Sequence, residues 1–172
     1  MVYSPTWISE DLQLGWTAPG NVDTSSLVPV GTVARFRDAV LGGGEFIYLA
    51  GAANTLLGSA VTYLLSDGVS LLGTTTLWAG TANTGQNIAF ATAAIVATDY
   101  GWYQIGGAAI AATSGTVSAG NPLYYQAAGV ISASAVNGKQ ISGAVAGSAN
   151  GVPTTNQTIV ILDRPHTQTQ TS

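Results

Sequence analysis

The chain has 172 residues and a net charge of −4, with four basic and eight acidic side chains that make up only 7% of the sequence. Average composition, at about 25% charged residues, would give about 43 charges in this length, and so few cations exclude a nucleic-acid-binding role based on neutralising phosphates. Cysteine is absent, which excludes disulfides, thiolate zinc sites and a cysteine nucleophile.

Residues 1–30 are predicted to form an extended N-terminal arm. They contain three of the six prolines and two of the four tryptophans, Trp7 and Trp16, and they show no regular hydrophobic period. Tryptophan buries a large area while losing few rotamers, which makes it a typical anchor of protein contacts. Trp7 and Trp16 are therefore interface candidates. Two arrangements stay open, because the arm could pack on a neighbouring molecule or fold back on its own sheet.

Residues 31–164 are predicted to form the β domain, and a dense charged patch stands near its start. The run Arg35-Phe36-Arg37-Asp38 contains two of the four cations. A bidentate contact between an arginine and a carboxylate across an interface would use such a patch. Exposed ion pairs on a solvated strand are common and weak. Arg35 and Arg37 are accordingly interface candidates, with a solvated strand face as the alternative.

The hydrophobic pattern along the domain has a period of two. Short runs rich in β-branched and aromatic residues, bounded by Gly, Asn, Asp or Ser, are typical of strands, and they occur at residues 46–49, 61–64, 102–105, 123–125 and 158–161. Ala128-Gly129 and Asn137-Gly138 predict tight turns, the second as the turn of a hairpin. The 22 glycines are spread along the chain, and each would cost a helix interior about 1 kcal/mol. We expect an all-β fold, as a small β-sandwich or barrel.

The chain also resembles itself. Residues 45–53 (EFIYLAGAA) match residues 101–109 (GWYQIGGAA) in their aromatic, aliphatic and Gly-Ala-Ala positions. Agreement in this order predicts a duplication, with strand-turn-strand repeats at 42–72 and 98–133 that pair as facing halves of the domain. Chance similarity between two hairpins in a Gly/Ala-rich chain is the alternative.

No catalytic, cofactor-binding or metal-ligating residues are predicted. The single histidine, His166, belongs to residues 165–172, which we expect to form a flexible polar tail, so nothing would orient it as a general base. The glycines at 42–44 precede a strand and not a helix, so they do not form a phosphate site. Asp67 and Asp99 suit turns, and a glycosidase-like pair of carboxylates formed across the fold stays open. We therefore expect a protein that is not an enzyme.

Four short segments carry a family resemblance: residues 29–38 (PVGTVARFRD), 44–51 (GEFIYLAG), 100–107 (YGWYQIGG) and 158–165 (TIVILDRP). They resemble small virion structural proteins of tailed bacteriophages, most closely the capsid decoration (cement) proteins. The resemblance spans about residues 29–165 and leaves the arm and the tail outside. It implies a β-rich, non-enzymatic protein on the outside of the capsid, often a trimer, whose partners are its own copies and the major capsid protein, with no cofactor.

The composition agrees with this expectation. Soluble domains carry mixed charges over about a quarter to a third of their surface, so we expect neighbouring protein to cover much of this exterior. No stretch offers ~20 apolar residues in a row, so no membrane partner is expected. The N-terminal sequence lacks the features of a secretory signal, in keeping with synthesis in the bacterial host cytoplasm and assembly into the virion.

A second function stays open from the sequence. The chain could be a sugar- or receptor-binding module of a phage head fibre or tail, in which Trp78 and Trp102 would stack on sugar rings. Burial of these aromatic side chains in the core is the competing explanation, because both stand in strand-like surroundings.

Overall fold

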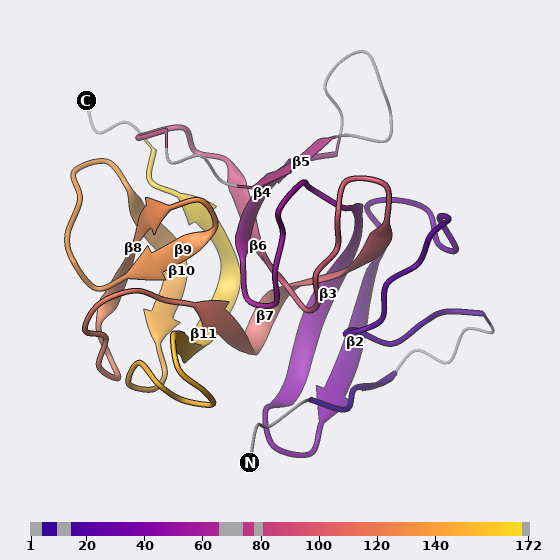
Figure 1. Cartoon of the computed structure of the whole chain (residues 1–172), viewed down its shortest axis with the longest axis horizontal. Helices are drawn as coiled ribbons and strands as arrows, with labels where there is room; N and C mark the ends of the chain where they lie inside the picture. The colour runs from indigo at the N-terminus through magenta and orange to yellow at the C-terminus, as the bar shows by residue number, and fades with distance from the viewer. Residues whose placement is uncertain (1–4, 10–14, 66–73, 78–80, 170–172) are drawn as a thin grey trace.

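The computed structural model describes residues 5–9, 15–65, 74–77 and 81–169 of the chain (Figure 1). These residues form strands and no helix, which confirms the predicted all-β class. The strands are β1 (Ile8–Ser9), β2 (Val33–Asp38), β3 (Gly42–Ala50), β4 (Ala60–Leu64), β5 (Thr74–Leu77), β6 (Asn87–Ala91), β7 (Tyr100–Ala112), β8 (Pro122–Ala127), β9 (Val130–Ser132), β10 (Gln140–Ala146) and β11 (Gln157–Thr167).

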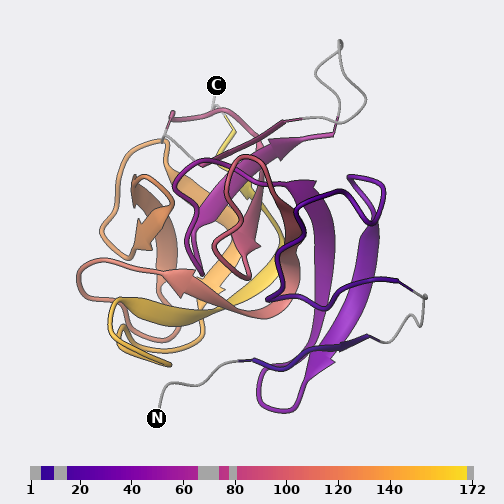
Figure 2. The ribbon, with the colours of Figure 1, turned by 45° about the vertical axis from the view of Figure 1, so that its right-hand side comes forward.

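All these strands belong to one antiparallel sheet that folds over in two halves. Its order is β1-β2-β3-β7-β6-β11-β10-β8-β9, with the β4–β5 hairpin attached to β6. The strands at the two ends of this order, β1 and β9, do not pair with each other, so the sheet is not closed into a barrel. Of the two predicted arrangements, sandwich and barrel, the fold is therefore sandwich-like. The 13-residue strand β7 joins the halves, because its first part pairs with β3 and its last part with β11 (Figure 2).

The strand pairings repeat along the chain. β3 pairs with β7, and β7 pairs in turn with β11. β4 pairs with β5 and β6, and β8 likewise pairs with β9 and β10. In these pairings β3 corresponds to β7, and β4 corresponds to β8. Each predicted repeat, 42–72 and 98–133, contains one such pair of strands, and the partners of β4 and β8 extend beyond the repeats, to β6 and β10.

The predicted hairpin at Asn137-Gly138 is wrong, although the turn itself exists. Gly138 has a φ of 71°, and the Lys139 N–H closes the turn on the carbonyl of Val136. The strands on either side, β9 and β10, do not pair with each other, because β8 lies between them. The hairpin turn of this region is instead the predicted turn at Ala128-Gly129, which joins β8 to β9.

Three clusters of buried side chains hold the sheet together. The aromatic cluster, on one face of β2, β3 and β7, consists of Trp7, Val28, Ala34, Phe36, Phe46, Tyr48 and Trp102. The central cluster, between β3–β7 and β4–β6, consists of Ile47, Leu49, Val61, Ala89, Ala91, Ile95, Tyr103 and Ile105. The third cluster fills the half built from the end of β7 and from β8–β11, and it includes Leu123, Tyr125, Ile131, Ile141, Val160 and Leu162.

The described part of the N-terminal arm folds back on its own sheet, which is the second of the two predicted arrangements. Trp7 is buried against Phe46, with ring centroids 4.8 Å apart. The Thr6 N–H donates to a carboxylate oxygen of Asp38 at 2.8 Å, and Ile8 pairs with Arg37 on the edge of the sheet. Asp38 also accepts from the N–H groups of two residues in the following turn, so one buried carboxylate fastens both the arm and the β2–β3 turn.

The prediction of a flexible polar tail over residues 165–172 is wrong for residues 165–169, which are held by the sheet and by a bridge. β11 continues to Thr167, whose side chain is buried and whose hydroxyl accepts a 2.7 Å hydrogen bond from the Gln86 N–H. Thr169 forms a further bridge with Thr84. Polar residues here extend the strand because a neighbouring segment supplies hydrogen bonds, which the sequence pattern does not reveal. Residues 170–172 lie outside the described residues.

Candidate functional site

The predicted interface candidates Arg35 and Arg37 both point outward from β2, because residues 33–38 alternate between exposed and buried. Arg35 stands opposite Glu45 of β3, with its guanidinium 3.7 Å from the carboxylate. Arg164, from β11, approaches the other oxygen of Glu45 at 3.0 Å. The two arginine side chains are 69% and 68% exposed, while that of Glu45 is 20% exposed, and ion pairs with so much exposure contribute little stability to the single chain.

Asp163 precedes Arg164 on β11 and lines the same hollow as Arg35 and Glu45. We call Arg35, Glu45, Asp163 and Arg164 the charged cluster. Arg35, Glu45 and Asp163 line an open hollow of about 390 Å³, together with Gly43, Gly44, Gly106 and Gly107. Glu45 and Asp163 are the two carboxylates of this hollow. A glycosidase needs one carboxylic acid kept neutral by apolar surroundings, whereas the carboxylate of Glu45 lies beside two guanidinium groups.

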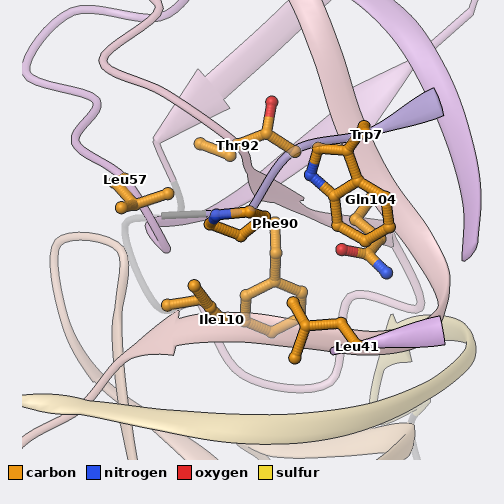
Figure 3. A pocket seen from close by; sticks show the side chains of 9 residues that line it. Trp7, Leu41, Leu57, Phe90, Thr92, Gln104 and Ile110 are labelled. Atoms are coloured by element: carbon orange, nitrogen blue, oxygen red, sulfur yellow. The ribbon is translucent and has the colours of Figure 1, made fainter. Parts of the chain in front are cut away.

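Trp7 and Trp16, the other interface candidates, are directed toward the chain's own core. The Trp16 ring lies 5.5 Å from that of Trp102. Trp7 helps to close a small cavity of about 20 Å³, which has room for about one water molecule. Figure 3 shows Trp7 beside Gln104, with Leu41, Phe90 and Ile110 around the same space. Both tryptophans therefore attach the arm to its own sheet.

The tryptophans of the sugar-binding alternative differ in what the structure describes. Trp102 is fully buried in the aromatic cluster, and its indole N–H donates to the carbonyl of Thr17 at 2.7 Å. Trp78 lies outside the described residues, as does Asp67. The burial of Trp102 agrees with the competing explanation, in which this side chain belongs to the core. An indole without exposed area offers no surface for stacking on a sugar ring.

A second, more apolar pocket of about 240 Å³ lies on the same side of the sheet as the charged cluster. Its lining is Val33, Ile47, Tyr63, Leu65, Asn87, Ile105, Arg164 and Pro165. His166 follows this lining on β11, where it is exposed and stands opposite Asn87 and Ser142. Across the described ranges, no group of three or more His, Cys, Asp or Glu side chains is placed to hold a metal ion.

Sequence reasoning missed a buried hydrogen-bond network between the N-terminal segment and the sheet. The Tyr48 hydroxyl donates to Asp23 at 2.7 Å, and the Thr17 hydroxyl donates to the same oxygen at 2.9 Å. Asp23 also forms a backbone bridge with Tyr100. No spacing signal links these residues, since the hydrogen-bonding partners of Asp23 depend on how the segment crosses the sheet.

Burial also shifts the acid–base behaviour of several tyrosines. It raises the pKa of Tyr48, Tyr63, Tyr103 and Tyr125 above the ordinary tyrosine value, and at Tyr48 the hydrogen bond to Asp23 adds to the rise. The Tyr103 hydroxyl is close to Thr55 and Ala52, yet it forms no hydrogen bond with any described residue. These phenols therefore resist ionisation only while the chain is folded.

We predict that the protein loses stability in alkaline solution. Below about pH 10, the ordinary tyrosine pKa, the phenols are protonated in both states. Above it the unfolded chain releases protons that the folded chain retains, so each such tyrosine lowers the free energy of unfolding by up to about 1.4 kcal/mol per pH unit. Thermal unfolding between pH 8 and 11.5 should show this decline, and Tyr103→Phe should make it shallower. An unchanged slope in that variant would contradict the prediction.

The exterior of the described residues carries many apolar side chains. Thirteen large aliphatic side chains are exposed, among them Val33, Leu65, Val145 and Ile161. No helix in the described part of the chain is long and apolar enough to cross a bilayer.

No family model, no curated protein and no solved structure matches this chain. What the arrangement offers chemically is contact area on broad sheet faces.

Proposed function

We propose that this chain is a non-enzymatic structural protein of a tailed-phage virion, which decorates and stabilises the outside of the capsid. It acts as a homo-oligomer, expected to be a trimer, and its second partner is the major capsid protein. The observation that carries the proposal is the surface: thirteen large aliphatic side chains are exposed in the described residues, while only 7% of the whole sequence is charged.

Such a surface suits subunit packing more than free solution. Flat β faces with few charges can be brought together without removing many ions from water, which is the main cost of burying charge. The acidic balance suits the outside of a shell, where no DNA phosphate has to be neutralised. A multimer that repeats over a lattice multiplies weak contacts into strong retention.

The segments that resemble decoration proteins agree with a scaffold role. Residues 44–51 and 100–107 fall on β3 and β7, where Phe46 stands opposite Gln104 and Tyr48 opposite Trp102. These segments therefore form the central strand pair, and their aromatic residues pack inward. The resemblance therefore lies in residues that build the sheet. The surfaces that contact partners are formed by residues that point outward.

The proposal is tested by adding the purified chain to empty shells assembled from the major capsid protein of the virus that encodes it. We expect the chain to co-sediment with these shells at a fixed ratio, to raise their unfolding temperature, and to run as a trimer in light scattering. Shells of an unrelated phage serve as the control. A monomer that leaves the cognate shells bare would contradict the proposal.

A further inference from the structure

The outward side of β7, β11 and β10 carries an apolar strip whose part around Ile161 and Val145 is exposed. Ile161 of β11 stands directly opposite Ala108 of β7 and Val145 of β10. Directly opposite residues of paired strands share one face of the sheet. Ile161 is 47% exposed and Val145 is 37% exposed. We call Ala108, Val145, Ile159 and Ile161 the β11 face.

The sequence of β11 is apolar on both sides, which is unusual for a strand with one face in water. Val160 and Leu162 point inward and are buried in the third cluster. Ile159 and Ile161 occupy the alternate, outward positions. Strands with one solvated face normally alternate apolar and polar residues, and strands apolar on both sides are normally covered twice. On the outer side of β11, Ile159 is partly buried and Ile161 is exposed.

The charged cluster borders the β11 face. Arg35, Glu45 and Gly106 are consecutive partners across β2, β3 and β7, and Gly106 stands opposite Asp163 of β11. This row lies two residues from Ile161 along β11, so it forms a charged rim beside the apolar strip. Protein interfaces commonly have this anatomy, with an apolar centre and a polar edge.

The charges of the rim indicate which partner fits. Two arginines and two carboxylates give the cluster no net charge, whereas the whole chain has a net charge of −4. A strongly acidic surface would be repelled by Glu45 and Asp163, and a strongly basic one by Arg35 and Arg164. A second copy of the same rim can offer an opposite charge to each of these side chains, so the patch is complementary to itself.

We propose that the β11 face, with the charged cluster at its edge, is the surface through which copies of this chain associate. The proposed decoration function requires contacts between copies of the chain. This inference rests on that function and assigns those contacts to the β11 face. Around a rotation axis, the same apolar side chains of each copy meet at the centre and the charged rims face one another. The contact covers the part of the outer side of β11, around Ile161, that the single chain leaves exposed.

The test is the self-association of Ile161→Lys, measured on the full-length chain by sedimentation velocity over a range of concentrations. A lysine in the apolar centre of the contact is expected to raise the dissociation constant at least about tenfold. The matched control is Val96→Lys. Val96 is 42% exposed and lies in the loop before β7, beside Gly51 at the far end of β3, so association should remain unchanged.

A second variant tests the rim independently of the apolar centre. Asp163→Arg leaves the cluster with three cations and one anion, so equivalent rims should repel each other. We expect weaker association at low salt and partial recovery at high ionic strength, where charges are screened. Far-UV circular dichroism of each variant checks that the sheet is intact, which is expected because both substituted side chains are exposed.

The outcomes separate this inference from the proposed function. Unchanged association in Ile161→Lys, or a wild-type chain that stays monomeric at high concentration, overturns the self-association surface. An oligomer that is weakened by Ile161→Lys but never binds shells supports the surface and contradicts decoration. A chain that binds shells and whose association is insensitive to both variants supports decoration and overturns the surface.

Discussion

Replacing Trp102 with alanine is expected to lower the free energy of unfolding by about 3–5 kcal/mol, as large-to-small changes of buried aromatic residues do. Trp102 is fully buried, and its ring centroid lies 5.1 Å from that of Phe36 and 5.2 Å from that of Tyr48. Its indole N–H also holds the carbonyl of Thr17, so the substitution leaves a cavity and an unpaired carbonyl at once. Urea unfolding followed by far-UV circular dichroism measures the loss.

Trp102→Phe is the matched variant, because it keeps an aromatic ring and removes the N–H donor. We expect it to cost less than the alanine variant, with the difference reporting the ring contacts. A loss below about 0.5 kcal/mol for Trp102→Ala, the range of ordinary surface substitutions, would contradict the position of Trp102 at the centre of the aromatic cluster.

Gly107→Ala is the second substitution with a large expected effect. Gly107 has a φ of 83°, and a Cβ atom at this position would overlap the backbone carbonyl oxygen of Gly43 on β3. A left-handed backbone alone costs an alanine about 1–2 kcal/mol. Because the clashing atom belongs to a neighbouring strand and not to a flexible side chain, we expect a total loss above about 3 kcal/mol, at the upper end of point substitutions.

Gly115→Ala separates the two contributions. Gly115 has a similar φ of 69°, and no atom lies within 4 Å of the position that its Cβ would occupy. Thermal unfolding should show a cost of about 1–2 kcal/mol for this variant, from the backbone conformation alone. Equal losses in the two variants would show that β3 and β7 are not packed as closely as described.

The strands were predictable because their side chains alternate. Each of the five predicted runs falls within a strand: 46–49 in β3, 61–64 in β4, 102–105 in β7, 123–125 in β8 and 158–161 in β11. The similarity between residues 45–53 and 101–109 was visible for the same reason, because residues 45–50 and 101–109 lie in the paired strands β3 and β7. Local pattern carries this information because inward and outward positions differ in polarity.

Which strands pair was not predictable from local pattern. Asn137-Gly138 has the residues of a hairpin turn, but β8 pairs with both strands beside it. The extension of β11 to Thr167 depends on Gln86 and Thr84, about eighty residues earlier in the chain. Glu45 and Arg164, which are 119 residues apart, meet only because β7 lies between their strands.

β7 serves both halves of the molecule, and this has a consequence for how the chain unfolds. Its first residues complete the aromatic and central clusters, and its last residues complete the third cluster. Neither half can lose its order without taking a strand away from the other. The two halves should therefore melt as a single cooperative unit, in contrast to tandem modules joined by a linker, which come apart one at a time.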